Sequence, residues 1–333
     1  MKYKLGFFII VLCFQSLPAF SQGEETVISS QCSLFKTRSV LELTNPLKIS
    51  NYEVQFRSCN LKGVPLIGLR EFQVEEQDYG LFVNPKTLET QILDMSCVSC
   101  HETQLNDLPQ SPYLERVRTH SSAPYPFFND GLTHLPQQKG YFLTVDLCPS
   151  RKPFEFSVFD NLRVQSQQNF PVGVAITGLW MKNYPQEVNW LKNKVLNHQL
   201  DVVWINHSYS HPYIKSLPDK DNFLLLKGVN FYEEVIGQEQ NMIANGLTPS
   251  IYFRFPGLIS NEEQIKQIEK YGLVALASDA WLAIDQVPHD GSIILIHGNG
   301  NEPPGIRMFF KFLENLKEMT LFKNLNLNSN FSK

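Results

Sequence analysis

The sequence lacks the charge patterns of two large classes of proteins. Its formal net charge is only −4, with 29 Lys and Arg against 33 Asp and Glu, so it has no basic footprint for nucleic acid. No run of like charges would dock on an anionic membrane. Hydrophobic residues make up 43% and charged residues 19% of the 333 residues. This composition excludes a collagen-like or disordered chain and allows one large α/β domain with a smaller one.

Long apolar runs are scarce too, and the one at the amino terminus is short. Lys2 and Lys4 flank the start of a run from Leu5 to Leu12, and Ala19-Phe20-Ser21 has the small-x-small pattern of a cleavage site. The run is too short to span a bilayer comfortably, and no second one follows. We therefore predict a signal peptide over residues 1–21, no transmembrane anchor after cleavage, and an exported chain that is periplasmic or secreted.

Cysteine is sparse, and its count is informative. One of the six cysteines, Cys13, lies inside the predicted signal peptide. The five that remain are Cys32, Cys59, Cys97, Cys100 and Cys148. In an oxidising compartment an odd count leaves at least one thiol free, metal-bound or otherwise modified. Parity alone makes Cys32 with Cys59 the first candidate disulfide.

One cysteine motif raises the question of haem. Cys97-Val-Ser-Cys100-His101 has the spacing by which haem is attached in c-type cytochromes, with His101 as the proximal ligand. Export favours haem c. Against it, no methionine follows His101 before Met181 to act as the usual second ligand. His120 or His134 could take that role instead. A local disulfide, or a partial zinc site with the other two cysteines of this region, would explain the motif equally simply.

The chain divides at about residue 140. Residues 22–139 form an irregular region in which short alternating segments, such as 52–56 and 79–83, predict strands; its role is not indicated. Residues 140–317 alternate apolar strands with amphipathic helices, which predicts a parallel α/β sheet or barrel. The remaining residues, 318–333, form a polar tail that we expect to be disordered from residue 323.

Two histidines follow directly after the apolar run Asp201-Val-Val-Trp-Ile205. In one turn of helix, residues i and i+4 lie on the same face, so His207 and His211 could point at one ion. Paired imidazoles suit zinc or a similar metal. Two surface histidines in a polar loop would have the same spacing, because pair spacing alone is a weak motif.

Other chemically useful residues also follow predicted strands, and in α/β barrels the active site lies at the carboxyl ends of the strands. They are Asp146 after 141–145, Arg254 after 249–253, Asp279 after 273–277 and His297 after 293–296. Taken singly, each is more often a cap, a salt-bridge partner or a core residue. Together they indicate a shared site.

Five segments, in this order, resemble the motifs of the polysaccharide deacetylase family, the NodB homology domain of chitin and peptidoglycan deacetylases. They are Leu143-Thr-Val-Asp146-Leu-Cys-Pro-Ser150, Asn206-His207-Ser-Tyr-Ser-His211-Pro212, Phe253-Arg254-Phe-Pro256-Gly257, Ser278-Asp279-Ala-Trp281 and Ile294-Leu295-Ile-His297. The likeness covers about residues 140–317. It implies a distorted (β/α) barrel of the α/β class, with a smaller β-rich or irregular N-terminal region. The activity that it implies is hydrolysis of acetyl groups on a glycan. The reaction would use one divalent metal, expected to be zinc.

The resemblance also implies roles for the main polar residues. His207 and His211 would hold the metal, which polarises the acetyl carbonyl and acidifies a water molecule. Asp146 would be the general base, oriented by Arg254, and His297 would protonate the departing amine.

Four further residues would complete the site. Asp279 would pair with His297 and keep it protonated. The backbone N–H of Gly257 would donate to the oxyanion. Trp281 and Leu295 would form the walls of the acetate pocket.

One position departs from the family pattern. The family has two consecutive aspartates in its first motif, and the second is a metal ligand, whereas Asp146 is followed here by Leu147. Leucine cannot bind a metal, and two histidines alone hold zinc weakly. Cys148 is the candidate replacement because a thiolate suits zinc. Otherwise Asp146 turns to the metal and the base is lost, or the site is a relic.

The sequence therefore predicts a metal-dependent hydrolase that removes N-acetyl or O-acetyl groups from a cell-envelope or extracellular polysaccharide. One alternative is an inactive glycan-binding descendant of the same fold. The other is a c-type haem protein with a fused deacetylase-like domain. The only partner indicated is the acetylated polysaccharide, and the sequence does not indicate an oligomeric state.

Overall fold

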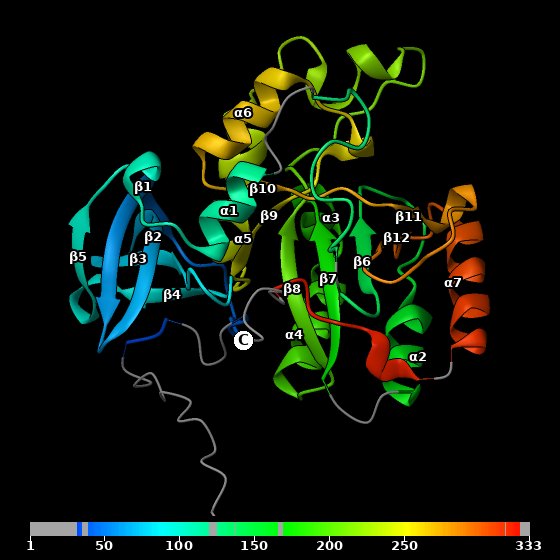
Figure 1. The fold of residues 1–333 in the computed structure, drawn as a ribbon, viewed down its shortest axis with the longest axis horizontal. Helices are drawn as coiled ribbons and strands as arrows, with labels where there is room; N and C mark the ends of the chain where they lie inside the picture. The colour runs from blue at the N-terminus through cyan, green and yellow to red at the C-terminus, as the bar shows by residue number, and fades with distance from the viewer. Residues whose placement is uncertain are drawn as a thin grey trace, which may run out of the picture.

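The computed structural model describes residues 32–34, 39–119, 125–136, 138–165, 169–316 and 318–326 (Figure 1). The predicted signal peptide, His120 and the last residues of the tail lie outside this part of the chain. Among the described residues, no helix combines the length and the apolar character needed to cross a bilayer.

The N-terminal region contains an antiparallel sheet of five strands in the order β4-β3-β2-β1-β5. Its strands are β1 (Ile49–Leu61), β2 (Val64–Val74), β3 (Gln77–Val83), β4 (Thr90–Asp94) and β5 (Ser99–Glu102). The turn between β1 and β2 is tight because Lys62 and Gly63 both have positive φ, 49° and 93°, as such two-residue hairpins require. The strands predicted over 52–56 and 79–83 are confirmed.

The second sheet has seven strands, all parallel, in the order β10-β9-β8-β7-β6-β12-β11. They are β6 (Phe142–Leu147), β7 (Phe170–Ile176), β8 (Leu200–Asn206), β9 (Pro249–Phe253), β10 (Val274–Ala275), β11 (Ala280–Trp281) and β12 (Ile293–His297). Each edge strand has two residues, and the sheet curves as a half-barrel. The predicted α/β class and distorted barrel are confirmed.

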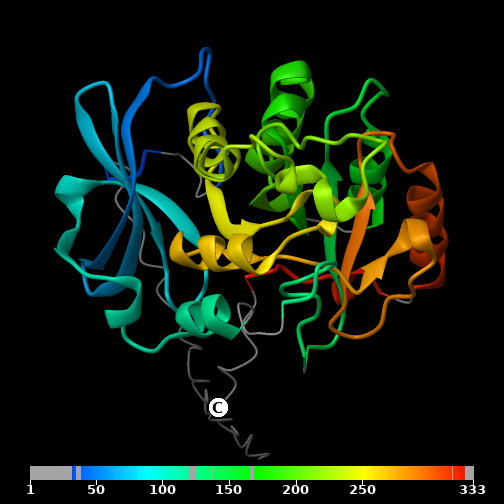
Figure 2. The same ribbon diagram turned by 90° about the horizontal axis from the view of Figure 1, so that it is seen from above.

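Most of the helices pack on the outer face of this sheet, whereas the first helix contributes to the core on its inner face (Figures 1 and 2). The described helices are α1 (Pro112–Thr119), α2 (Phe156–Gln165), α3 (Gly178–Asn183), α4 (Pro185–Leu196), α5 (Gln238–Ala244), α6 (Glu262–Lys270) and α7 (Pro303–Asn315). Alternate residues of β6, Leu143, Val145 and Leu147, share the core with α2, α3, α4 and α7. Leu147 is fully buried there, so this position faces the helices rather than the sheet's inner face.

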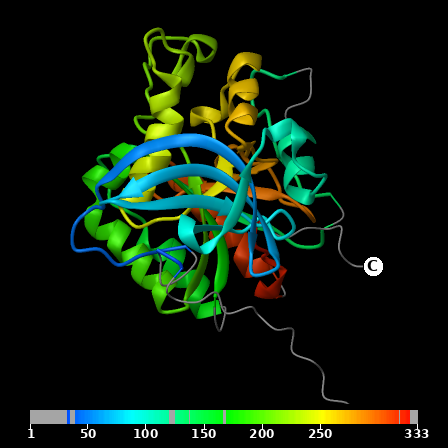
Figure 3. The same ribbon diagram turned by 90° about the vertical axis from the view of Figure 1, so that its left-hand side faces the viewer.

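The inner face of the half-barrel is filled from the side of the antiparallel sheet. Phe142 and Ile293 of the barrel share a core with Leu69 of β2, Leu114 of α1 and Leu325 near the carboxyl end. Figure 3 shows the antiparallel strands lying across the barrel on this side. The N-terminal region is therefore an integral part of the core.

Local signals explain most helix boundaries, and the structure corrects one predicted cap and part of the predicted disorder of the tail. Pro185 opens α4 at its first turn, where a missing N–H is tolerated. Helix α6 was predicted to begin with a cap at Ser260, but the side chain that accepts from the Gln264 N–H belongs to Asn261. The predicted disorder is wrong for residues 323–326, because Leu325 is buried and its carbonyl accepts a hydrogen bond from Tyr252.

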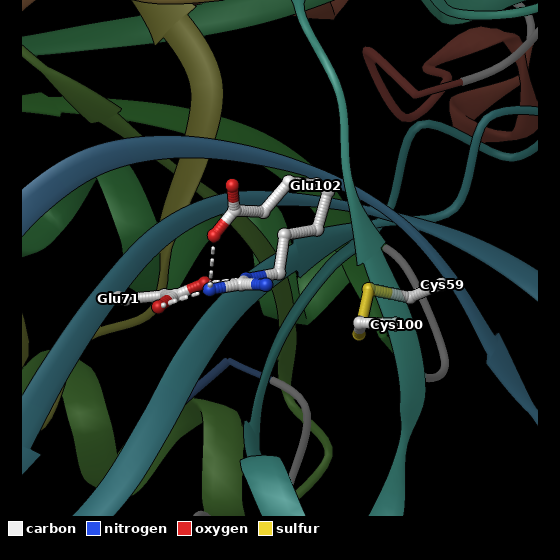
Figure 4. The surroundings of a disulfide bond; sticks show 5 residues. Cys59, Glu71, Cys100 and Glu102 are labelled. Carbon is white, nitrogen blue, oxygen red and sulfur yellow. Dashed lines mark hydrogen bonds and ion pairs between the residues drawn. A yellow bond between two sulfur atoms is a disulfide. The ribbon is translucent and has the colours of Figure 1, made fainter.

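The haem alternative for this motif is wrong. Cys97 is disulfide-bonded to Cys32 and Cys100 to Cys59, so neither sulfur is available for a thioether to haem. The predicted pairing of Cys32 with Cys59 is wrong for the same reason. Cys59 and Cys100 lie directly opposite each other on β1 and β5 (Figure 4), which is why the second disulfide forms. Cys148 is a free, buried thiol.

Candidate metal and acid-base site

Three potential metal ligands converge beyond the carboxyl ends of β6 and β8. Ligand atoms of Cys148, His207 and His211 all lie within 4.8 Å of one another, and Cys148 Sγ is 3.4 Å from His207 Nε2. The two imidazole rings are edge-on, with centroids 4.9 Å apart. Cys148 and His207 are almost fully buried. One sulfur and two nitrogens form a ligand set that suits zinc.

The loop that carries the histidines is not the predicted helical turn. Ser208 and His211 have positive φ, 67° and 45°, so the chain folds back irregularly after β8. The Asn206 side chain stabilises this loop, since it accepts from the Ser208 N–H at 3.0 Å and donates to the Val235 carbonyl at 2.7 Å. The histidines therefore meet through loop geometry, not helical spacing.

Hydrogen bonding fixes the orientation of His207. Its Nδ1 lies 2.9 Å from the carbonyl oxygen of Arg254, which can only accept, so Nδ1 carries the proton and Nε2 faces Cys148. Metal-binding histidines are commonly oriented in this way. Burial alone would lower the pKa of His207, but the negative charges of Asp146 and Cys148 outweigh it, and the pKa is raised.

Asp146 and Arg254 form a buried ion pair beside these ligands. Arg254 Nη1 is 2.6 Å from Asp146 Oδ1 and also donates to Thr144 Oγ1 at 2.8 Å, while Nη2 donates to the Ala277 carbonyl at 3.1 Å. The other carboxylate oxygen, Oδ2, lies 3.6 Å from His207 Nε2. Arg254 thus holds one oxygen of Asp146 and leaves the second beside the ligand set.

His297 is held by a carboxylate that the sequence analysis did not select. Its Nδ1 lies 2.8 Å from Glu302 Oε2, and the same oxygen accepts a hydrogen bond from Trp281 Nε1 at 2.9 Å. Burial alone would lower the pKa of His297, but the charges of Cys148 and Asp146 and the polar contacts with Cys148 and Glu302 outweigh it and raise the pKa well above its usual value. The ring, whose side chain is 13% exposed, therefore favours the protonated form.

The predicted partnership between Asp279 and His297 is wrong. Asp279 Oδ1 accepts from the Ile293 N–H at 3.0 Å, at the amino end of β12, whereas His297 is the last residue of that strand. The reason is strand register. Asp279 directly precedes β11, whose first residue, Ala280, pairs with Ile294 near the start of β12. Asp279 instead contacts His134 and His289.

The remaining predicted residues lie close to the same end of the sheet. Trp281 and His297 have ring centroids 6.2 Å apart. Leu295 is buried on β12 two residues before His297, which puts both on the same face of the strand. Gly257 has φ 62°, and a Cβ there would lie 2.4 Å from the ring of Phe223. The ring centroids of Phe223 and His211 are 5.9 Å apart.

Only its nearness in sequence to His297 could have drawn attention to Glu302. It follows His297 by five residues, in a loop rich in Gly, Asn and Pro that folds back over the strand end. The sequence did not reveal that His134 and His289 approach Asp279, because they lie in separate connections with no common motif.

Burial alone would raise the pKa of the Cys148 thiol, but the neighbouring charges of His211, His297 and His207 outweigh it and lower the pKa well below its usual value. Cys148 is therefore disposed to be a thiolate, the form that binds metals and acts as a nucleophile. The site as a whole combines this thiolate, two further potential ligands, a carboxylate held by Arg254 and an imidazole that favours its protonated form. Such a set can perform metal-assisted hydrolysis of an acyl group.

Comparisons with known proteins find similarity at the level of the fold. No family model matches the chain. A family 4 carbohydrate esterase from Bacillus anthracis is 20% identical, with a TM-score of 0.43, over 66% of this chain and 92% of the other. A chitin deacetylase from the fungal pathogen Colletotrichum lindemuthianum is 14% identical, with a TM-score of 0.39, over 56% and 86%.

Another similar structure is a pseudoenzyme of the same esterase family from Bacillus anthracis, 14% identical with a TM-score of 0.39, over 81% of this chain and 86% of the other. The structures to which this chain is similar thus include carbohydrate esterases and a pseudoenzyme. At this level of identity the likeness assigns no activity, so the chemistry has to be inferred from the side chains of this chain.

Proposed function

We propose that this protein is a metal-dependent hydrolase that removes acetyl groups from an exported polysaccharide of the cell envelope or extracellular space. One observation carries the proposal: Cys148, His207 and His211 converge beside a carboxylate, Asp146, that Arg254 holds in place. Hydrolysis of an amide or ester needs an activated water molecule and a proton donor for the leaving group. His297 supplies the second requirement.

The donor set fits a divalent ion such as zinc. Cys148, His207 and His211 would hold it, with the thiolate in place of the aspartate that the family has at position 147. Three protein ligands leave one position of a tetrahedral ion open, as catalytic zinc sites do. An ion held there polarises a carbonyl oxygen and lowers the pKa of a water molecule.

The chain's own residues would divide the proton transfers. Asp146 would accept a proton from the attacking water through Oδ2, because Oδ1 is paired with Arg254. His297 would donate a proton from Nε2 to the departing oxygen or nitrogen, because Nδ1 faces Glu302. We assign the Gly257 N–H to the oxyanion and Trp281 and Leu295 to the acetate pocket, as the family resemblance implies.

The substrate class and the location belong to the proposal as well. The two disulfides favour an oxidising compartment, as does the predicted signal peptide. An exported hydrolase with this site would meet acetylated glycans such as peptidoglycan or chitin. Its acetyl pocket would accept N-acetyl or O-acetyl groups.

The proposal is tested by acetate release from peptidoglycan and from chitooligosaccharides, with metal analysis on the same mature protein. We expect acetate release and about one bound zinc ion at this site, and loss of both in His207→Ala. His101→Ala is the matched control, because His101 is exposed on β5. Bound metal without acetate release from any glycan would favour the inactive glycan-binding descendant instead.

A second candidate mechanism is favoured by the surroundings of Cys148. Its sulfur lies 3.4 Å from His207 Nε2 and interacts with His297, whose Nδ1 lies beside Glu302, an arrangement similar to a cysteine–histidine–carboxylate triad. In that mechanism the thiolate would attack the acetyl carbon and displace the alcohol or amine, which takes a proton from His297. Water would then hydrolyse the thioester and release acetate.

The two mechanisms differ in what inactivates the protein. A chelator would abolish metal-dependent hydrolysis, and zinc would restore it. The thiol mechanism would survive the chelator, and acetylated Cys148 would be detected by mass spectrometry after rapid acid quenching. Full activity in chelator, together with this thioester, would overturn the metal proposal.

A further inference from the structure

A second group of potential metal ligands lies outside the proposed catalytic site. His134, Asp279 and His289 each offer a ligand atom, and all three atoms lie within 4.8 Å of one another. They come from three separate connections: the segment before β6, the segment between β10 and β11, and the segment before β12. None of the acid-base chemistry described above uses this group.

The spacing of these atoms fits a coordination shell. His134 Nδ1 lies 2.9 Å from Asp279 Oδ2, and His289 Nε2 lies 3.5 Å from the same oxygen. Ligands about 2.0–2.2 Å from a tetrahedral zinc ion are roughly 3.3 Å apart. An ion could therefore be accommodated with small side-chain movements.

The surrounding groups already orient the ligands. Ser292 Oγ lies 3.0 Å from His289 Nδ1, which leaves Nε2 of that ring facing Asp279. Asp279 is fixed by the Ile293 N–H on Oδ1 and by Ser292 Oγ, 3.2 Å away, on Oδ2. The two imidazole rings are stacked with centroids 5.0 Å apart. Such supporting contacts are typical of metal sites, where they set the tautomer and direction of each ligand.

Gly291 makes room for His134. A Cβ at this position would lie 2.7 Å from the Cε1 and Nε2 atoms of His134, and its φ of 87° strongly favours glycine. His134 and Ser292 also form a backbone bridge. The connection before β12 is thus built closely around the imidazole.

This group is separated from the proposed catalytic site by the length of a strand. Asp279 contacts the amino end of β12 at Ile293, whereas His297 ends the same strand. An ion here could not share ligands with Cys148, His207 and His211. The His289 side chain is 64% exposed, so an ion would reach the site from solvent and water would complete its coordination.

We propose that His134, Asp279 and His289 form a second binding site for a divalent transition metal, with zinc as the leading candidate. Two imidazoles and one carboxylate are ligands that zinc, nickel and copper accept. The ion would link the three connections near the amino end of β12. This inference does not depend on the proposed function.

The test is zinc stoichiometry, measured by elemental analysis after equilibrium dialysis of the mature protein with micromolar zinc. We expect about two ions for the parent, about one for His289→Ala, about one for His207→Ala, and none for the double variant. His101→Ala is the control and should bind as the parent does. His289 is largely exposed, so its variant should fold, which circular dichroism would check.

Asp279→Asn provides an independent variant that retains an oxygen to accept from the Ile293 N–H. It should weaken zinc binding at this site at least about tenfold. Parent zinc counts in both His289→Ala and Asp279→Asn would overturn the second site. If the catalytic site alone were wrong, the parent would bind one ion that His289→Ala loses and His207→Ala keeps, so the two failures are distinguishable.

Discussion

Arg254 and Asp146 determine the charge balance of the candidate site. Both side chains are buried, and Arg254 is fully so. Removing one partner of such a pair leaves the other charge buried without compensation. We expect Arg254→Met to lower the free energy of unfolding by about 3–5 kcal/mol, measured by urea denaturation.

The double variant Arg254→Met with Asp146→Asn is the control for that prediction. It removes both charges and should recover part of the lost stability, although it stays inactive. No recovery in the double variant would mean that Arg254 stabilises the fold through Thr144 and the backbone carbonyls rather than through Asp146.

Asp130 gives a pH-dependent stability. Its Oδ2 is buried and has no hydrogen-bond partner among the described residues, and burial raises the pKa of this carboxyl to about 6. The folded state favours the protonated Asp130 carboxyl. Its contribution to the free energy of unfolding is therefore fully present below about pH 4 and is lost as the pH rises through about 6.

Asp130→Asn should therefore stabilise the protein at pH 8, by about 1–2 kcal/mol after allowance for partial exposure, and have little effect at pH 4. Denaturant midpoints of parent and variant at the two pH values measure this. An equal effect at both values would show that the carboxyl does not change its protonation between them.

The individual site residues could be predicted from sequence only where they end a strand. Asp146, Arg254 and His297 follow apolar runs, and the structure brings Asp146 and Arg254 into contact. Glu302, and not the expected Asp279, lies beside His297, because a partner across a loop depends on how the chain folds back after the strand. No periodic pattern encodes that return.

At the scale of elements, one disulfide links β5 covalently to β1. The bond between Cys59 and Cys100 closes a loop of 41 residues in sequence separation. Removing it by Cys59→Ala with Cys100→Ala should lower the free energy of unfolding by about 2–5 kcal/mol. Ser99→Ala, an exposed neighbour on β5, is the control.

The two disulfides also predict the visible absorbance of the protein. Protein made with a haem-attachment system should remain colourless, because both cysteines of the motif are oxidised. A Soret band would contradict the disulfide assignment. Unchanged stability in the double alanine variant would contradict the structural role of the bond.

Regular elements were easier to predict than the loops that carry ligands. Apolar runs identified β8 and β9, and Gly272 correctly ended α6, because periodicity and turn residues act locally. The loop from His207 to His211 has positive φ at two residues that are not glycine. Tertiary contacts hold such a conformation, so spacing alone suggested a helix there.

At the scale of the whole molecule, a buried ion pair joins the antiparallel sheet to a helix of the barrel region. Arg70 of β2 lies 2.5 Å from Glu239 of α5, and both side chains are fully buried. Tyr52 donates a further hydrogen bond to Glu239 at 2.7 Å. Arg70→Leu should therefore lower the free energy of unfolding by about 3–5 kcal/mol.

This pair also predicts how the molecule unfolds. The antiparallel sheet and the barrel share one core, so tryptophan fluorescence and far-ultraviolet circular dichroism should report a single transition in the parent. The double variant Arg70→Leu with Glu239→Leu is the control, because it removes both charges and leaves neither buried without its partner. Two separate transitions in the parent would contradict a single cooperative unit.

The overall fold class followed from the alternation of strands and helices after residue 140. The role of residues 22–139 did not, because alternating strands reveal which face is apolar but not what covers it. In the structure, that apolar face closes the interior of the half-barrel.

We propose that Cys148 replaces the missing acidic ligand at a zinc site. This ligand is best identified by zinc X-ray absorption on the His289→Ala protein, which lacks the proposed second site. We expect a sulfur atom at about 2.3 Å from zinc, and its loss in Cys148→Ser. A shell containing only nitrogen and oxygen at about 2.0–2.2 Å in the unsubstituted Cys148 protein would contradict it.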